Sequence, residues 1–346
     1  MIGYYVHHQG RGHLHRAVSL SPHVRAPLVG FSSLPQPADW AGEWVQLPMD
    51  AEPGEDHQAA ALDPTAHGTL HWAPRHHGGL RDRMGLIAEW IARTGPRLFV
   101  SDVSVEVAVL ARLMGTPVVV AAMRGDRFDR AHRLGYDLAD ALLAPWPRTA
   151  PVSGWSKSWL AKTVHTGAFS RYDDRPRPHP DRPAPTREVV VLVGAGGAGI
   201  HVEDLLQARE ATPGWSWRCL GNSADGWVED PWPLLCRADV VVTHAGQNAI
   251  AECAAARTPA IVIPQERPHD EQRATAHALE SAGLATVRPS WPPPGEWADL
   301  LNRAAKRDGG RWTAWSPGDG AQRAARMLDQ MSATIPEEWQ VACASQ

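Results

Sequence analysis

The chain has 346 residues, a formal net charge of −4 at pH 7 and a hydrophobic fraction of 43%. This length is typical of about two domains, and the apolar content is sufficient for two cores. Charges of both signs are mixed without a basic excess, which excludes a chain built mainly to bind nucleic acid.

The cysteines and the apolar runs indicate where the chain is located. Four cysteines are scattered without a CxxC pair, namely Cys219, Cys236, Cys253 and Cys343. We therefore expect neither a zinc knuckle nor a disulfide framework, and a reducing cytoplasm fits. The start MIGYYVHHQG lacks the features of a signal peptide, and no run reaches the ~18 apolar residues of a membrane span. We expect a soluble, cytoplasmic chain without a transmembrane segment.

The first predicted unit is a strand, a glycine-rich turn and a helix. An apolar run at residues 2–6 passes into HHQGRGHLHR and then into a helix-compatible stretch at residues 14–20. Gly10 and Gly12 allow a sharp turn and a close approach of the backbone to a ligand. A functional interpretation of these glycines is that the turn forms part of a ligand site.

Several histidines surround this turn. His13 falls at the start of the predicted helix, where it could simply cap the helix or face a ligand. The residues alone do not separate it from its neighbours His7, His8 and His15.

Two further strands are predicted at residues 26–31 and 44–47, followed by a long irregular segment at residues 49–79. Such a segment inside a compact domain is usually functional or mobile. It contains several histidines around Trp72, namely His67, His71, His76 and His77. Their spacing fits no standard zinc pattern, and no carboxylate or cysteine joins them in sequence. We therefore prefer a role in shaping an acceptor pocket, with Trp72 offering a flat face.

Next come an amphipathic helix from Leu80 to Ile91 and a buried strand at residues 98–100. The strand ends on Asp102, and a helix is predicted at residues 103–114. Open α/β sheets place chemistry at the carboxyl ends of their strands, so Asp102 is a candidate site residue. It could equally cap the helix that follows.

Further strands are predicted at residues 118–122 and 142–144. The charged residues after the first of these could line a cleft, but mutual pairing on a solvated helix is the preferred interpretation. They are Arg124, Asp126, Arg127 and His132.

The proline-rich segment 171–187 has no apolar periodicity and is predicted to be a stiff linker. A strand at residues 188–193 and the loop GAGGAG at residues 194–199 follow it. GxGxxG between a strand and a helix is typical of dinucleotide binding, which makes a nicotinamide-dependent oxidoreductase an alternative. The acid expected at the end of the next strand is missing, because residues 215–220 lead into Gly221 and Asn222. This disfavours the oxidoreductase.

Residues 239–285 organise the second half of the chain. A buried strand at residues 240–242 ends in a turn at residues 243–247, which leads into a helix from Asn248. The free amides and the positive dipole end of that helix suit a phosphate.

Acidic and amide side chains follow that turn. Glu252 lies one turn into the helix, where a carboxylate can accept hydrogen bonds from a ribose diol. After a strand at residues 260–263, Glu271 and Gln272 lie in the first turn of another helix and suit sugar hydroxyls. Each residue alone could belong to an ordinary βαβ unit, but their order together favours a nucleotide-sugar site.

These motifs carry a resemblance to a known group of enzymes. HAGxNxxxE (residues 244–252), a strand, Pro264 and EQxxxA (residues 271–276) resemble the donor-site signature of glycosyltransferases with the GT-B fold. The stretch is especially similar to the C-terminal domain shared by the UDP-glycosyltransferases and the peptidoglycan N-acetylglucosaminyltransferase (MurG-like) family. GxGHxxR and SDxxxxVAxxARxxGxPVV are similar to N-terminal segments of the same enzymes. Thr275 departs from the pattern, since many relatives carry Asn there.

The resemblance implies a role for each matching residue. His13 would be the catalytic base and Asp102 its acid partner, which would fix the tautomer of His13 and stabilise the imidazolium. Glu252 would contact the ribose, and Glu271 with Gln272 the transferred sugar. The amides and loops around the diphosphate would come from Gly12, Gly194, Gly196, Gly197, His244, Ala245, Gly246, Gln247 and Asn248.

The resemblance also implies a fold and a reaction. The expected architecture is α/β: two Rossmann-like, doubly wound parallel-sheet domains that face each other across a cleft. The expected divisions are an acceptor-side domain, a linker, a donor domain and a helical segment that crosses back, at residues 1–170, 171–187, 188–316 and 317–346.

The expected activity is inverting transfer of a hexosyl or N-acetylhexosaminyl group, without a metal or cofactor, because no DxD motif is present. The donor would be a nucleotide sugar with UDP preferred, although thymidine and guanosine stay open. The acceptor would be a small or lipid-linked molecule. A nucleotide-sugar epimerase or a non-enzymatic sensor on the same scaffold stays an alternative.

Overall fold

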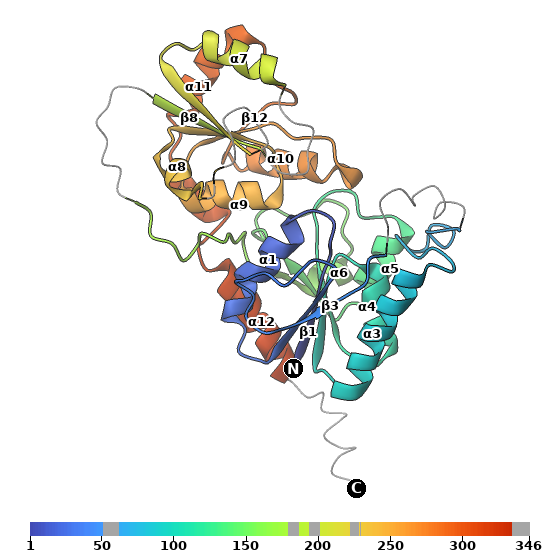
Figure 1. Ribbon diagram of the computed structural model, residues 1–346. Helices are drawn as coiled ribbons and strands as arrows, with labels where there is room; N and C mark the ends of the chain where they lie inside the picture. The colour runs from blue at the N-terminus through green and yellow to red at the C-terminus, as the bar shows by residue number, and fades with distance from the viewer. Residues whose placement is uncertain (51–61, 179–186, 194–200, 222–227, 229, 334–346) are drawn as a thin grey trace.

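The computed structural model describes residues 1–50, 62–178, 187–193, 201–221, 228 and 230–333. Two parallel sheets form the centres of two lobes, which we name the N-terminal and the C-terminal lobe (Figure 1). This is the predicted α/β arrangement of two parallel-sheet domains.

The N-terminal lobe contains a fully parallel sheet of seven strands in the order β3-β2-β1-β4-β5-β6-β7. Its strands are β1 (Ile2–Val6), β2 (Leu28–Ser32), β3 (Glu43–Gln46), β4 (Leu98–Asp102), β5 (Val118–Ala121), β6 (Ala141–Ala144) and β7 (Thr163–His165). Its helices are α1 (Gly12–Leu20), η1 (Ser21–His23), α3 (Gly78–Thr94), α4 (Val105–Leu113), α5 (Arg130–Leu138) and α6 (Lys157–Ala161). The central strands are buried along their whole length, so helices must cover both faces of the sheet.

The C-terminal lobe contains a parallel sheet of five strands in the order β12-β11-β10-β8-β9. Its strands are β8 (Arg187–Leu192), β9 (Trp215–Leu220), β10 (Val240–Thr243), β11 (Ala260–Val262) and β12 (Thr286–Val287). Its helices are α7 (Val202–Glu210), α8 (Trp232–Arg237), α9 (Gln247–Ala256), η2 (Pro268–Asp270), α10 (Glu271–Ser281), η3 (Pro294–Glu296), α11 (Trp297–Ala304) and η4 (Gly309–Ala314). Helices α8, α9 and α10 lie on the side that faces the N-terminal lobe (Figure 1).

The last described helix, α12 (Gly320–Ala333), belongs to the core of the N-terminal lobe although it follows the C-terminal lobe in sequence. It packs against α1 and η1 (Figure 1). The carboxylate of Asp329 accepts hydrogen bonds from the backbone N–H groups of Arg25 and Ala26 at 3.0–3.1 Å. The chain therefore crosses between the lobes twice, while the predicted boundaries of the folding units stay a prediction.

The predicted start of the helix after β4 was wrong. The helix expected at residues 103–114 is α4, which begins at Val105, because Val103 adopts a left-handed φ of 68° and Ser104 is the N-cap. The Ser104 hydroxyl accepts the N–H of Val107 at 3.2 Å. Asp102 therefore does not cap this helix, and its carboxylate is available for other partners.

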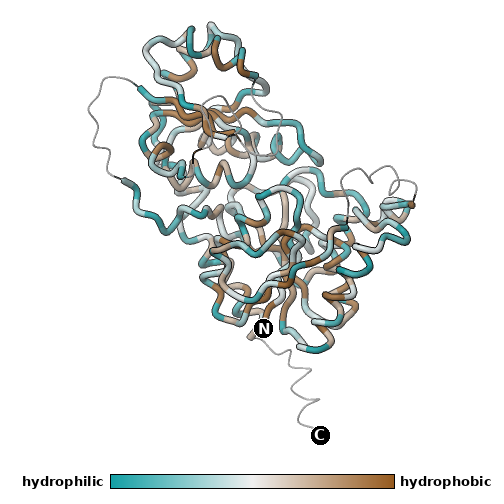
Figure 2. Tube along the Cα trace, in the orientation of Figure 1, coloured by the Kyte–Doolittle hydropathy of each residue, from teal (hydrophilic) through white to brown (hydrophobic). Residues whose placement is uncertain are grey.

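Apolar residues concentrate along the strands at the centre of each lobe (Figure 2). Within the N-terminal lobe, the rings of Trp40 and Trp44 pack edge to face with centroids 5.1 Å apart, above Gly30 in β2. Among the described residues, no helix combines the length and the apolar character needed to cross a bilayer.

Two glycine substitutions should have opposite effects on stability. A Cβ at Gly30 would lie 2.3 Å from the Trp44 ring and 2.9 Å from the Trp40 ring, whereas a Cβ at Gly85 in α3 meets no atom within 4 Å. We predict that Gly30→Ala lowers the free energy of unfolding by about 2 kcal/mol through overpacking. Gly85→Ala should raise it by about 1 kcal/mol through helix propensity. Urea denaturation measures both, and equal effects of the two variants would contradict the packing described here.

Candidate active site

The carboxyl ends of the strands in both sheets open towards the junction of the two lobes, where α1 contacts α9. Side-chain contacts cross this junction near the start of α1. The Nη1 of Arg16 donates to the Oε1 of Gln247 at 2.8 Å, and the Nδ2 of Asn248 donates to the carbonyl of Gly12 at 3.4 Å. The predicted residues Gly12, Gln247 and Asn248 therefore meet at one place.

Asp102, at the end of β4, is 0% exposed and accepts hydrogen bonds from two neighbouring elements. Tyr4 of β1 donates its hydroxyl to Oδ2 at 3.2 Å. Arg16 of α1 donates Nε to Oδ2 and Nη2 to Oδ1, each at 2.9 Å, which is a bidentate pair. Burial alone would raise the pKa of Asp102, but the charges of Arg16 and His13 outweigh it and hold that pKa at about 2. Asp102 is therefore ionised at neutral pH.

His13 lies beside this carboxylate, with its Nδ1 2.8 Å from Oδ1 of Asp102. An ionised carboxylate only accepts hydrogen bonds, so we assign the imidazole proton to Nδ1, which leaves the lone pair on Nε2. The Nη2 of Arg16 lies 3.0 Å from the same Nδ1, and both donors converge on Oδ1. The side chain of His13 is 16% exposed, so a ligand can reach it.

The three neighbouring histidines have other partners. The Nδ1 of His7 accepts the N–H of Gln9 at 3.1 Å, and burial lowers the pKa of His7 to about 3. His8 faces Asp50 at 3.4 Å. The Nδ1 of His15 accepts from Asn248 at 3.3 Å, and burial lowers the pKa of His15 to about 4. Of these four histidines, His13 is the one that is hydrogen-bonded to the fully buried Asp102.

Arg16 was not among the site residues expected from the sequence. It lies three residues after His13, and positions three apart share one face of a helix. Its guanidinium joins the buried carboxylate of the N-terminal lobe to Gln247 at the start of α9 in the C-terminal lobe. The signal was present in GxGHxxR, but the partner of the arginine was not visible in the sequence.

The turn before α9 uses some of the amides that were expected to face a phosphate. The N–H of Gly246, the N-cap of α9, donates to the Nδ1 of His244 at 2.9 Å. The N–H of Ala245 donates to the Oε1 of Gln272 at 3.2 Å. Burial lowers the pKa of His244 to about 4, so its imidazole is neutral. The positive end of α9 therefore begins at Gln247 and Asn248.

Glu252 is buried in the second turn of α9, where Arg171 donates its Nε to Oε1 at 3.0 Å. Burial raises the pKa of Glu252, and the positive charge of Arg171 opposes this rise. The side chain of Arg171 is 39% exposed, so the counter-ion stays in contact with solvent.

Glu271 and Gln272 lie at the start of α10 and have different surroundings. The Oε2 of Glu271 accepts from Arg127 of the N-terminal lobe at 3.1 Å, and burial raises the pKa of Glu271 against the opposing charge of Arg127. The Oε1 of Gln272 also accepts the N–H of Gln265 at 2.9 Å, so this oxygen joins the turn before α9 to the loop after β11. The oxygen expected at a sugar hydroxyl is thus bound to two backbone amides. Thr275 donates to the carbonyl of Glu271 at 3.0 Å.

The expectation that the charged residues after β5 lie on a solvated helix was wrong, because Arg124, Arg127 and His132 are buried. Mutual pairing does occur between Arg127 and His132, whose Nη1 and Nε2 are 3.2 Å apart, but other partners lie on other elements. Arg124 donates to the carbonyl of Ala150 at 2.7 Å and lies over the ring of Trp146 at 5.4 Å. Arg127 reaches Glu271 across the junction, and these charges therefore form part of the contact between the lobes.

The predicted diphosphate glycines Gly194, Gly196 and Gly197 lie outside the described residues. A pocket of about 170 Å³ lies at the carboxyl ends of β8 and β10. Most of its exposed lining is apolar, and its walls include Val193, Val242, His244, Ile263 and Trp291. Its position beside His244 makes it a continuation of the site at the start of α9.

Comparisons with known proteins agree with this geometry. The Glycosyltransferase family 28 C-terminal domain matches residues 232–290. An uncharacterized glycosyltransferase of Methanopyrus kandleri is 27% identical over 275 residues, which are 69% of this chain and 76% of the relative. The crystal structure of the kitacinnamycin glycotransferase superposes with a TM-score of 0.66 at 17% identity, covering 95% of this chain and 98% of the other, and shows the GT-B fold. The chain is a glycosyltransferase.

A second relative of this glycosyltransferase is more specific in its name. The UDP-N-acetylglucosamine--N-acetylmuramyl-(pentapeptide) pyrophosphoryl-undecaprenol N-acetylglucosamine transferase of Gloeobacter violaceus is 27% identical over 157 residues. The match covers 39% of this chain and 43% of that enzyme. The resemblance to the MurG-like family is confirmed, and the oxidoreductase and epimerase alternatives have no support in these comparisons.

Removing one member of the buried Arg16–Asp102 pair should cost more than removing both. We predict that Arg16→Met lowers the free energy of unfolding by about 3 kcal/mol, because it leaves the carboxylate buried without its guanidinium. Adding Asp102→Asn to Arg16→Met should recover part of that loss, as measured by urea denaturation in a double-mutant cycle. Strictly additive losses would contradict the pairing.

The same pair predicts a pH dependence of stability. The pKa of Asp102 is about 2 in the folded protein and ~3.9 when unfolded, so its contribution is present above pH ~4 and is lost as the pH falls towards 2. In Arg16→Met the charge that lowers the pKa of Asp102 is gone, while the burial that raises it remains, so the acid loss of stability due to Asp102 should become smaller or reverse its sign. Unfolding midpoints measured from pH 6 to pH 3 test this, and parallel profiles for the two proteins would contradict it.

Proposed function

We propose that this glycosyltransferase catalyses inverting, metal-independent transfer of a hexosyl or N-acetylhexosaminyl group from a UDP-sugar to an acceptor hydroxyl. The observation that carries the proposal is the buried His13–Asp102 pair, which lies across the lobe junction from the start of α9. One lobe supplies a base, and the other supplies the positive end of a helix.

The base has to remove the proton of the acceptor hydroxyl during attack, because such a hydroxyl is far too weak an acid to ionise at pH 7. With its proton on Nδ1, His13 offers Nε2 to the acceptor. Asp102 then stabilises the imidazolium that forms, as the acid of a catalytic triad does. General-base catalysis of this kind contributes about 10²- to 10⁴-fold in rate.

The leaving group is a nucleoside diphosphate, which gains negative charge as the glycosidic bond breaks. The dipole of α9 and the N–H groups at Gln247 and Asn248 offer fixed positive potential to that charge. Fixed backbone donors can do the work that a metal ion does in transferases with a DxD motif, and the chain has no such motif. If the acceptor attacks the anomeric carbon in a single displacement, from the side opposite the leaving diphosphate, the configuration of that carbon is inverted.

The remaining donor contacts follow from the side chains around α9 and α10. We place the ribose hydroxyls on Glu252, which keeps Arg171 as its counter-ion, and the sugar hydroxyls on Glu271, held by Arg127. The apolar pocket beside His244, walled by Trp291, suits the nucleobase. Uridine is the preferred base because the similar transferase of Gloeobacter violaceus is named for UDP-N-acetylglucosamine.

The acceptor would approach from the N-terminal lobe, near the segment that carries Trp72. The Nε1 of Trp72 donates to the carbonyl of Asp50 at 2.7 Å, and the carboxylate of Asp50 lies 3.4 Å from His8, which precedes the glycine-rich turn. A small or a lipid-linked acceptor is compatible with this placement. The cysteine spacing supports a cytoplasmic reaction, which stays a prediction.

A substitution of the proposed base should affect turnover and nucleotide binding differently. We predict that His13→Ala lowers the turnover of UDP-sugar, measured as transfer or as slow donor hydrolysis, by at least about 100-fold. Its binding of UDP, measured by calorimetry, should change less than about threefold, since the nucleotide contacts lie on the C-terminal lobe. The control His277→Ala, exposed on α10, should keep both. Retention of most turnover in His13→Ala would mean that another group is the base.

If Glu252 contacts the ribose, its substitution should lower the affinity for UDP and raise the stability of the protein at high pH. Glu252→Gln should weaken UDP binding about tenfold, because a hydrogen bond to a charged acceptor becomes neutral. The pKa of Glu252 is raised in the folded protein, so its ionised form costs stability as the pH rises. The variant should therefore be as stable as the parent at pH 5 and relatively more stable at pH 8, in urea denaturation.

The control for this experiment is Glu280→Gln on the exposed side of α10, which should change neither property. A panel of UDP, TDP, GDP and ADP in a thermal-shift assay should give its largest shift with UDP. Loss of stability in Glu252→Gln without a loss of UDP affinity would make Glu252 a structural residue and would contradict the ribose contact.

A further inference from the structure

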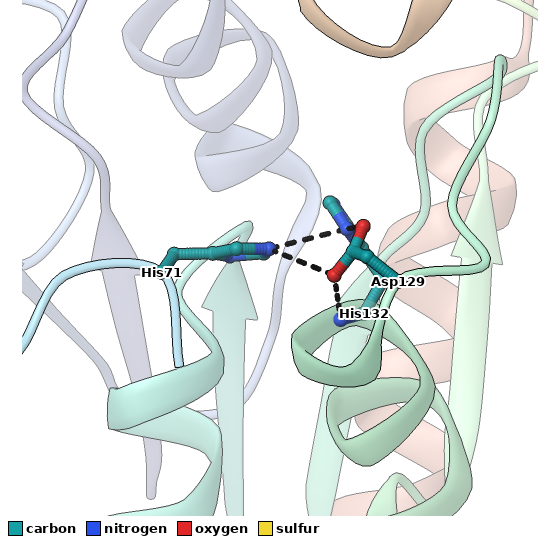
Figure 3. Close-up of side chains that lie close together, drawn as sticks. All are labelled: His71, Asp129 and His132. Atoms are coloured by element: carbon teal, nitrogen blue, oxygen red, sulfur yellow. Dashed lines mark hydrogen bonds and ion pairs between the residues drawn. The ribbon is translucent and has the colours of Figure 1, made fainter. Parts of the chain in front are cut away.

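Three side chains that the proposed reaction does not use converge at the edge of the N-terminal lobe (Figure 3). His71 comes from the segment before α3, Asp129 is the N-cap of α5, and His132 lies in the first turn of α5. The Nε2 of His71 is 3.1 Å from the Nδ1 of His132 and 3.5 Å from Oδ1 of Asp129. The Oδ2 of Asp129 also contacts the Nδ1 of His132. One nitrogen from each ring and one carboxylate therefore point at a common centre.

These separations fit a divalent metal ion with nitrogen and oxygen ligands. Zn–N and Zn–O bonds of about 2.0–2.2 Å at a tetrahedral angle place neighbouring ligand atoms about 3.3–3.5 Å apart. The distances from the Nε2 of His71 to its two neighbours, 3.1 and 3.5 Å, lie close to that edge length. Two imidazoles and one carboxylate form a donor set that zinc and similar ions bind in proteins.

The segments that carry the ligands are held in place by other contacts. The N–H groups of His71 and Trp72 both donate to Oε1 of Glu106, at 2.7 and 3.0 Å. The Oδ1 of Asp129 accepts the N–H of His132 at 3.0 Å, which caps α5. The backbone on both sides is thus positioned without an ion, and binding would order only the three side chains.

A metal site was not expected at the histidine-rich segment, because no carboxylate or cysteine joins these histidines in sequence, but in the fold the carboxylate of Asp129 lies beside His71. Asp129 and His132 lie 58 and 61 positions after His71 and reach it only through the fold. Such a separation is invisible to a search for standard ligand spacing. His67, another histidine of this segment, has its Nε2 3.5 Å from Oδ2 of Asp63, and its side chain is 90% exposed.

Binding an ion would change one further contact. The Nη1 of Arg127 lies 3.2 Å from the Nε2 of His132 and can only donate, so without an ion Nε2 accepts and Nδ1 carries the proton. Coordination through Nδ1 moves that proton to Nε2 with no net change in charge, and the contact with Arg127 must then open. Arg127 keeps its partner Glu271 in the C-terminal lobe, so the ion would be linked to the donor side of the cleft.

We propose that His71, Asp129 and His132 bind a divalent transition-metal ion of the zinc class, which fastens the Trp72 segment to α5. The role is structural and lies outside the transfer chemistry. His269 of the C-terminal lobe is a further candidate ligand, with its Nδ1 3.8 Å from Oδ2 of Asp129. Otherwise water completes the coordination.

The test is direct binding of Zn²⁺ alone to the full chain after dialysis against a chelator. We expect one equivalent to bind with micromolar or tighter affinity in competition with a chromophoric chelator, and Co²⁺ to give an absorption spectrum typical of four-coordinate nitrogen and oxygen ligands. His71→Ala and Asp129→Asn should each weaken binding by at least about 100-fold. Asn keeps the helix cap, so Asp129→Asn tests the ligand rather than the fold.

The matched control is His67→Ala, which removes an exposed histidine from the same segment and should bind Zn²⁺ as the parent does. Zn²⁺ should raise the unfolding temperature of the parent and of His67→Ala, but not of the two ligand variants. Absence of a stoichiometric site in the parent would overturn the proposal. So would equal affinity in the parent, His71→Ala and Asp129→Asn, since the ion would then bind elsewhere.

Discussion

The active-site region depends on the burial of one carboxylate. Asp102 has no exposed surface, so its charge is tolerated only because Arg16, His13 and Tyr4 all donate to it. Those donors come from β1 and α1, and they fix α1 relative to β4. Through Gln247, Arg16 extends the same network into the other lobe. The buried charge of Asp102 must be compensated by hydrogen-bond donors. This one requirement orients the imidazole of His13 and brings Arg16 into contact with Gln247 of the other lobe.

A second consequence is that the charges at the lobe junction are shared between sites. Arg127 contacts both Glu271, on the proposed donor side, and His132, in the proposed metal site. Arg16 contacts both Asp102, which orients the proposed base, and Gln247, at the positive end of α9. Each guanidinium joins a residue of one lobe to a residue of the other.

The sequence was a good guide to the sheets, because parallel strands buried on both faces are short β-branched runs such as residues 240–242. It was a poorer guide to helix ends. The start of α4 is set by the left-handed backbone conformation of Val103, which the pattern of side chains in the sequence does not predict. The nearness of His13 and Asp102 came from the resemblance to glycosyltransferases, since the two residues lie 89 positions apart. Contacts such as Arg127 with Glu271 and His71 with Asp129 had no signal of either kind.

The central claim is that the two lobes present a base and a helix end to opposite sides of one nucleotide sugar. A crystal structure of the chain with UDP tests it most directly. The account predicts that the β-phosphate lies within hydrogen-bond distance of the backbone amides of Gln247 and Asn248. The ribose hydroxyls should contact Glu252, and the Nε2 of His13 should face the space next to the β-phosphate that the sugar of the donor would occupy. A nucleotide bound away from the start of α9, or a His13 ring turned away from it, would contradict the account.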